Sequence, residues 1–331
     1  MVFDANPLHG RAEGGATAGV LRIRLPFMGV PVEFETDAPL VRAAVEGALG
    51  SWRLLEQRPE LVSSSARTLP RIQLRLAHDP CDPAGDITVS SAAPGLVELN
   101  GPGVHGSADG ARLTAACTVT AAVLEDRYVF EETVLPSLVL NLTTHLDRQP
   151  LHAAAVRRGA HTVLLHGPSG AGKSTLAYAA SGTGWHVLSD DAVFLQAKPQ
   201  LRIWARPSRL HLPPEAVAWF PELAERPLVR RQNGRWKVWV EPTAAWPAVL
   251  QPAEHAILCL LERGDGEPDA RKIAGAAAVR TVLDSLEPGF VLFRDTIGPV
   301  LRTLVGRHAW IVRTGPDPWR TVQLLDQLRD A

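Results

Sequence analysis

The chain has 331 residues, of which 46% are hydrophobic and 21% are charged, and its formal net charge is −1. This length allows one large domain or two ordinary ones, and the composition is typical of folded proteins and not of disordered ones. A nearly neutral chain has no general attraction for nucleic acid or for an anionic membrane, so we expect neither as a partner.

The cysteines and the first residues bear on the cellular compartment. Cys81, Cys117 and Cys259 are too far apart in the sequence to form a metal-binding or redox motif. The opening segment MVFDANPLHG lacks the basic start and apolar core of a signal peptide, and the longest apolar stretch, LTAACTVTAAVL, is too short to cross a bilayer. These features favour a cytoplasmic protein with reduced cysteines.

The first part of the chain predicts a mixture of strands and helices. In chain order, hydrophobic periodicity predicts a β-hairpin over 21–27 and 30–36, a helix over 38–57, a strand over 71–77, several short strands within 86–122 and a helix over 130–146. We therefore expect residues 1–147 to form a smaller α+β domain, which would recognise a substrate or a partner.

The pattern changes after residue 147, where apolar strands alternate with helices. The predicted elements are strands over 150–156, 161–167 and 185–189, a helix over 173–180, hairpins over 192–207 and 228–242, a strand over 254–263, helices over 276–286 and 296–306, a strand over 309–315 and a final helix over 317–331. This alternation predicts an α/β domain over 148–331 with a partly parallel sheet.

The most specific motif is GPSGAGKS, at Gly167–Ser174, which matches G-x-x-x-x-G-K-[ST] in full. It follows an apolar strand and precedes a helix, which is the context that a phosphate-binding loop requires. One of only four lysines in the chain stands at its functional position, Lys173. Glycines allow successive backbone N–H groups to point at phosphate oxygens, and the start of the following helix adds to the favourable field. The predicted nucleotide-binding residues are Gly167, Pro168, Ser169, Gly170, Ala171, Gly172, Lys173, Ser174 and Thr175.

Two adjacent carboxylates, Asp190 and Asp191, follow the next predicted strand. A right-handed crossover would return that strand beside the loop strand, so that both aspartates lie at the edge where open α/β sheets bind ligands. Neighbouring carboxylates are costly without a cation, and Mg²⁺ would supply one. We expect one aspartate to hold Mg²⁺ and the other to accept the proton of an attacking hydroxyl.

The order LHAAAV, phosphate loop, short helix, SDDAV resembles the catalytic domain of the HPr kinase/phosphorylase family. The resemblance implies a core shared with ATP-dependent phosphoenolpyruvate carboxykinase, ATP and Mg²⁺ as cofactors, and transfer of phosphate to a serine of a protein, or of a precursor peptide in lasso-peptide gene clusters. It also implies frequent oligomers. By this resemblance His152 is an active-site histidine, Lys173 and Ser174 hold the phosphates and the metal, Asp190 is the catalytic base and Asp191 is its acidic neighbour. We assign Asp191, together with Ser174, to Mg²⁺.

Arginines after the aspartates depart from the family pattern, which has a glutamate-containing segment there. Of Arg206 and Arg209, we select Arg209 as a candidate catalytic side chain, since arginine binds phosphate in a bidentate manner. The predicted hairpin over 228–242 carries further basic and tryptophan side chains, which would hold a substrate peptide or adenine, or else form an amphipathic sheet edge.

The sequence thus predicts an ATP- and Mg²⁺-dependent kinase that phosphorylates a hydroxyl, with a serine of a peptide or small protein as the expected acceptor. Two other functions stay open. One is a kinase acting on a small molecule such as an amino acid or a sugar, and the other is a nucleotide-binding switch without catalysis.

Overall fold

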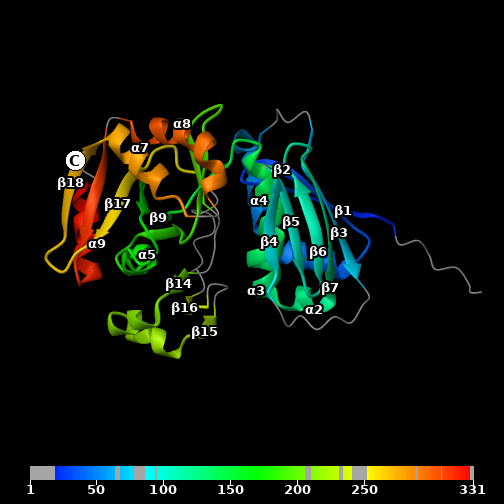
Figure 1. The fold of residues 1–331 in the computed structure, drawn as a ribbon, viewed down its shortest axis with the longest axis horizontal. Helices are drawn as coiled ribbons and strands as arrows, with labels where there is room; N and C mark the ends of the chain where they lie inside the picture. The colour runs from blue at the N-terminus through cyan, green and yellow to red at the C-terminus, as the bar shows by residue number, and fades with distance from the viewer. Residues whose placement is uncertain are drawn as a thin grey trace, which may run out of the picture.

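The computed structural model describes residues 19–63, 68–77, 86–93, 95–205, 210–230, 234–240, 252–287, 290–306 and 308–328. Within these ranges the chain is a mixed α/β protein with one seven-stranded sheet, one six-stranded sheet and two three-stranded sheets. Figure 1 shows the seven-stranded sheet on one side of the view and the other sheets on the opposite side. None of the helices in these ranges is both long enough and apolar enough to span a membrane.

The seven-stranded sheet contains all strands that precede residue 121. Its strands, in spatial order, are β1 (Leu21–Phe27), β2 (Val30–Thr36), β3 (Arg71–Ala77), β7 (Thr114–Thr120), β6 (Val104–Asp109), β5 (Leu96–Gly101) and β4 (Thr88–Ala93). The predicted first hairpin is confirmed: β1 and β2 pair antiparallel around Met28 and Gly29. Both turn residues have positive φ, 49° and 73°, which is the backbone of the two-residue turn that matches the twist of paired strands.

The helices of this half differ in length from the prediction. They are α1 (Pro39–Leu49), α2 (Ala121–Glu125), α3 (Arg127–Val129) and α4 (Leu135–Thr144), with 3₁₀ segments at Gly50–Gln57 and Pro59–Leu61 and a π-helical turn at Phe130–Val134. The helix expected over 38–57 is therefore an α-helix only to Leu49 and continues as a 3₁₀ helix from Gly50 to Gln57. The helix expected over 130–146 becomes regular only at Leu135, because Pro136 lacks an N–H and fits only a first turn.

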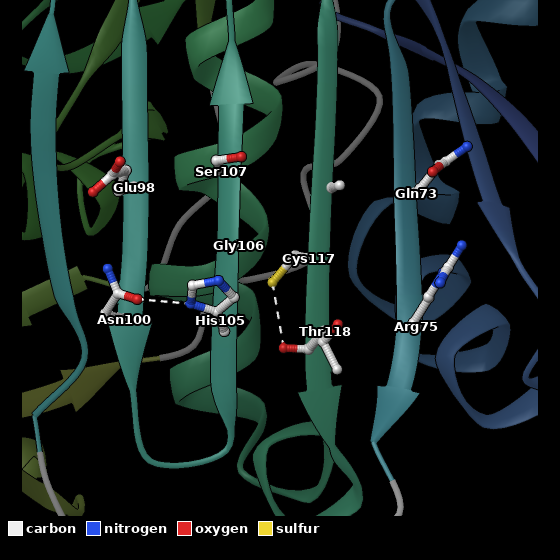
Figure 2. A pocket seen from close by; sticks show the side chains of 10 residues that line it. Gln73, Arg75, Glu98, Asn100, His105, Gly106, Ser107, Cys117 and Thr118 are labelled. Carbon is white, nitrogen blue, oxygen red and sulfur yellow. Dashed lines mark hydrogen bonds between the residues drawn. The ribbon is translucent and has the colours of Figure 1, made fainter.

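One face of the seven-stranded sheet is apolar and the other is polar. Helices α1 and α4 pack on the apolar face and share one hydrophobic core with the strands. The polar face contains a hollow of about 550 Å³ across β3, β7, β6 and β5. Figure 2 shows Arg75, Glu98, His105 and Thr118 around this hollow, with a hydrogen bond between the side chains of Asn100 and His105.

The six-stranded sheet contains, near its centre, the strand that precedes the GPSGAGKS motif. In spatial order it contains β11 (His186–Ser189), β9 (Ala154–Arg158), β10 (His161–His166), β17 (Ile257–Arg263), β19 (His308–Thr314) and β18 (Asp269–Ala274). Strands β10, β17 and β19 are parallel neighbours, as expected for an α/β fold. Strand β18 was not predicted; it is an antiparallel edge strand whose residues are mostly exposed.

Helices cover both faces of this sheet. They are α5 (Lys173–Ser181), α7 (Gly275–Asp284), α8 (Arg294–Val305) and α9 (Pro318–Leu328). Val163 and Leu165 of β10 point into the core under α5 and α9, whereas Leu164 points into the core under α7 and α8. Because both faces are buried, the motif strand needs a continuous apolar run and not an alternating pattern.

The strand predicted over 150–156 is wrong as a single element. It is broken into β8 (Gln149–Leu151) and β9, which belong to different sheets. Strand β8 pairs with β12 (Val193–Gln196), which also pairs with β13 (Arg202–Ala205) as the predicted hairpin. The last sheet is β14 (Leu210–Leu212), β16 (Trp236–Val240) and β15 (Leu228–Arg230), and its β15–β16 pairing agrees with the predicted hairpin there.

Two chain segments that run side by side therefore leave one sheet and enter another at the same place. Strand β11 pairs with β9 through Ser189 and Ala155, and four residues further on β12 pairs with β8 through Val193 and Leu151. These two pairs share one antiparallel register across the break, and a bulge between Val187 and Ser189 sets the earlier β11–β9 pairs one residue out of it. The residues inside the break are 152–153 on one strand and 190–192 on the other, and they include three of the predicted site residues.

Candidate active site

The loop between β10 and α5 has the backbone that its glycines predict. Gly170 and Gly172 have φ of 88° and 98°, a region that other residues rarely adopt, and Gly172 caps the start of α5. A Cβ on Gly167 would lie 3.0 Å from the Cβ of Ala171 and 3.1 Å from the carbonyl oxygen of Leu261. The loop is therefore closely packed against β17, and its shape depends on these three glycines.

Lys173 is the first residue of α5, and its side chain folds back into the loop. Its Nζ donates to the carbonyl oxygens of Gly167, at 2.7 Å, and Pro168, at 3.3 Å. Burial lowers the pKa of Lys173, and the neighbouring carboxylates Glu287, Asp191 and Asp190 oppose this shift in that order. The ammonium thus lies among carbonyls and acidic groups, where a phosphate would compete for it.

The remaining loop residues are consistent with a compact turn. The backbone N–H of Ala171 donates to Pro168 at 3.0 Å, while Ser174 and Thr175 are half-buried in the first turn of α5. The side chain of Ser169 is exposed and accepts a 3.4 Å hydrogen bond from Arg235, which immediately precedes β16. The β15–β16 hairpin therefore reaches the outer side of the loop.

The sheet order corrects one step of the prediction. Strand β11 does not lie beside β10, because β9 is inserted between them and is antiparallel to both. Strands β10 and β11 still run in the same direction, so the ends that carry Gly167 and Asp190 lie at one edge of the sheet. The start of β9 lies at this edge as well, and it places His152 between the loop and the aspartates.

The two adjacent aspartates have different surroundings. Asp190 is buried, with 4% of its surface exposed, and its Oδ2 accepts a 2.9 Å hydrogen bond from the backbone N–H of His211 in β14. The side chain of Asp191 is 58% exposed. The fixed, desolvated carboxylate suits a proton acceptor, whereas the solvated one is accessible to a hydrated cation.

His152 contacts carboxylates on both sides of its ring. Its Nδ1 lies 3.4 Å from Oδ1 of Asp191, and its Nε2 lies 3.4 Å from Oε1 of Glu287. Burial lowers the pKa of His152, the charge of Lys173 lowers it further, and the two carboxylates oppose both effects. The ring of Phe290 packs against the imidazole at 5.4 Å between centroids. This side chain therefore belongs to the same cluster as Lys173 and the aspartates.

Glu287, which follows α7, is a residue of this cluster that was not predicted. Its carboxylate contacts His152, and it is the largest of the acidic influences on the pKa of Lys173. No motif surrounds this glutamate, so the only signal in the sequence is its position near the end of a helix in the α/β half. The buried side chain of His166 supports the backbone of His152, because its Nδ1 lies 2.8 Å from the carbonyl oxygen of His152.

Arg206 and Arg209 lie outside the described residues, so the predicted catalytic role of Arg209 stays a prediction. The described residues include other basic groups near the loop. Besides Arg235, Lys237 in β16 is close enough to lower the pKa of Lys173. Two basic side chains of the predicted hairpin, Arg235 and Lys237, thus lie near the loop.

The donor set fits a cation held together with nucleotide phosphates. In the described ranges no three or more His, Cys, Asp or Glu side chains are arranged to form a metal cage. Magnesium does not need one, since it is commonly held by one or two carboxylates or hydroxyls, by water and by substrate phosphates. Ser174 and Asp191 provide oxygen donors of this type.

Comparison with known proteins does not identify the family of this chain. No family model matches the chain, and no curated protein matches it. Among solved structures, the structure of the Hpr(Ser) kinase/phosphatase from Coxiella burnetii matches with 13% identity, over 55% of this chain and 97% of that chain. The TM-score is 0.28, which is too low to carry an argument. Function must therefore be inferred from the chain's own residues.

Proposed function

We propose that the protein is an ATP-dependent kinase that transfers the γ-phosphoryl group to a hydroxyl. The observation that carries this proposal is the convergence of the glycine loop, Lys173, His152 and two aspartates at one edge of the six-stranded sheet. Phosphoryl transfer depends mainly on positioning and on charge, and this edge offers N–H groups, a buried cation and fixed carboxylates together.

The residues would divide the work according to their surroundings. The loop N–H groups and Lys173 bind the phosphates, and the ammonium exchanges its loop carbonyls for phosphate oxygens. Asp190 accepts the proton of the attacking hydroxyl. At the same time the hydroxyl oxygen forms a bond to the γ-phosphorus, and the bond from that phosphorus to ADP breaks. His152 lies next to this path and keeps the carboxylates in place. Magnesium, held by Ser174 and Asp191, would neutralise charge on the phosphate oxygens.

We further propose a serine of a peptide or small protein as the acceptor. The exposure of Asp191 and Ser169 leaves the site open toward solvent, which suits a bulky acceptor better than a metabolite enclosed in a pocket. The order of motifs, which resembles that of HPr kinases, agrees with this choice. The first 147 residues would then recognise the acceptor or a partner.

Nucleotide binding and transfer can be tested separately. A fluorescent ATP analogue with Mg²⁺ should bind the wild type, and Lys173→Ala should weaken binding by about 100-fold, since hydrogen bonds to charged groups contribute about 1.5–3 kcal/mol each. Asp190→Asn should keep nucleotide affinity but lower transfer from labelled ATP by about 10²–10⁴-fold, the usual contribution of a general base. Serine-containing peptides encoded beside this gene are the first acceptors to use.

Each outcome decides between the open functions. Unchanged nucleotide affinity in Lys173→Ala would refute the phosphate site itself. Binding without transfer to any peptide or metabolite acceptor would favour a nucleotide-dependent switch. Transfer to a free amino acid or sugar, with none to peptides, would identify a small-molecule kinase.

A further inference from the structure

The hollow on the polar face of the seven-stranded sheet lies between two rows of side chains that cross the strands. One row passes through Ala116 and Ser107 to Glu98 in β5. The row two residues further along passes from Arg75 in β3 to His105 in β6. The small side chains of Ala116 and Ser107 leave the middle of the face low, and the volume of about 550 Å³ is that of a ligand site. Figure 2 shows that hydroxyl, amide and imidazole groups line the hollow.

Outside the hollow, the charged side chains of β1 and β2 on this face form ion pairs. Arg22 in β1 lies 3.1 Å from Glu35 in β2. Arg24 lies 3.3 Å from Glu33 in the same two strands. Arg71 in β3 contacts both carboxylates, at 3.3 Å and 3.7 Å. These charges are therefore largely satisfied within the sheet and offer little to a ligand.

The two charged side chains at the rims of the hollow are different. Arg75 and Glu98 are exposed, and neither forms an ion pair within the part of the chain that the structure describes. They are too far apart to pair with each other, because three strand spacings and a shift of two residues separate their Cα atoms by about 16 Å. Figure 2 shows them on opposite sides of Ser107. The hollow thus has an unpaired cation at one rim and an unpaired anion at the other.

We propose that this hollow binds an extended peptide segment of a partner protein, with an acidic side chain at Arg75 and a basic side chain at Glu98. An extended chain covers the separation of the rims in about four or five residues. A small zwitterion such as a free amino acid cannot reach both rims, because its two charges are on neighbouring groups. The hydroxyls of Ser107 and Thr118 suit the N–H and C=O groups of a peptide backbone between the rims. This inference goes beyond the proposed kinase function and does not depend on it.

A random-peptide display library, selected on the nucleotide-free full-length protein, tests the proposal. We expect the enriched sequences to carry an acidic and a basic residue about four or five positions apart. The most enriched sequence is then synthesised with a fluorophore, and fluorescence polarisation gives its Kd. Failure to enrich any sequence, or enriched sequences without this charge pair, would overturn the proposal.

Substitutions at the two rims then locate the contact. Arg75→Ala and Glu98→Ala should each weaken binding of the labelled peptide by about two- to five-fold, as the loss of an exposed ion pair does. The matched control Arg24→Ala, on the same face but outside the hollow, should bind as the wild type does. Arg75→Glu should weaken binding by more than about ten-fold, because it places like charges together. The double variant Arg75→Glu/Glu98→Arg should prefer a peptide in which the acidic and basic residues are exchanged.

Each remaining outcome decides for or against this site. Unchanged affinity in Arg75→Glu, or no preference of the double variant for the exchanged peptide, would place the peptide elsewhere and overturn the proposal. Self-association in sedimentation that Arg75→Glu abolishes, without enrichment of any peptide, would assign the face to a second copy of the chain instead. Phosphoryl transfer enters none of these measurements, so its absence would refute the kinase proposal alone.

Discussion

The buried histidine His166 makes the stability of the α/β half depend on pH in a predictable way. Burial lowers its pKa from 6.5 to about 4, and only 2% of its surface is exposed. Above pH 6.5 the side chain is neutral in the folded and the unfolded chain and has no effect. Below pH 6.5 the unfolded chain binds a proton that the folded chain does not bind, so the free energy of unfolding falls until the pH reaches about 4.

The magnitude follows from the two pKa values. Between pH 7 and pH 5, the difference in proton binding removes about 1.8 kcal/mol from the free energy of unfolding, out of about 3.4 kcal/mol over the whole range. The variant His166→Asn cannot bind this proton. As the pH falls from 7 to 5, the free energy of unfolding of the variant should therefore decrease by about 1.8 kcal/mol less than that of the wild type. The variant is nevertheless expected to be less stable than the wild type at pH 7.

Urea unfolding at pH 7, 6 and 5, followed by tryptophan fluorescence and by circular dichroism, measures the effect, and the two probes must coincide for a two-state analysis. The matched control is His161→Asn, since His161 is exposed at the start of the same strand. The control should keep the pH dependence of the wild type. Equal slopes for the wild type and His166→Asn would show that His166 accepts a proton in the folded protein, and would refute the reasoning.

Four further substitutions test other parts of the structure. Gly106→Ala should cost about 1–3 kcal/mol in urea unfolding, because its Cβ would lie 2.7–2.8 Å from atoms of β7, whereas Gly47→Ala in α1 meets nothing within 4 Å and should stabilise by about 0.5–1 kcal/mol. Arg148→Met should destabilise by about 3 kcal/mol, since it removes a buried 2.9 Å hydrogen bond to the Met28 carbonyl; no loss of stability would contradict this. Arg235→Ala should weaken binding of the fluorescent ATP analogue by about two- to five-fold, which is typical of an exposed charge; a larger loss would place it deeper in the site.

Local patterns predicted the elements that depend on neighbouring residues. The alternation around Met28 and Gly29 was enough for the first hairpin, because a two-residue turn fixes the register of its strands. The loop and α5 were predicted from the glycine motif, because Gly170 and Gly172 adopt the positive φ angles that the loop requires. The periodicity of residues 317–331 likewise predicted α9.

Long-range arrangement could not be predicted in the same way. An apolar segment such as 150–156 has the same pattern whether it forms one strand or crosses between two sheets, so the break at His152 was not visible. Strand β9 lies between β10 and β11 because it forms an antiparallel hairpin with β10. The right-handed crossover used for the prediction concerns only the two parallel strands and the helix between them. Glu287 reaches the site only through the packing of α7, and no local motif accompanies it.

The shared break in the two strand pairs implies that this part of the chain cannot change length. The four-residue steps from Ala155 back to Leu151 and from Ser189 to Val193 must stay equal for both sheets to remain paired. Inserting or deleting one residue there would reverse which side chains point to which face of β12, and would exchange Val193 and Leu195 with Phe194 and Gln196 between two buried layers of different shape and polarity. Natural variants of this protein should therefore have no insertions or deletions in the break.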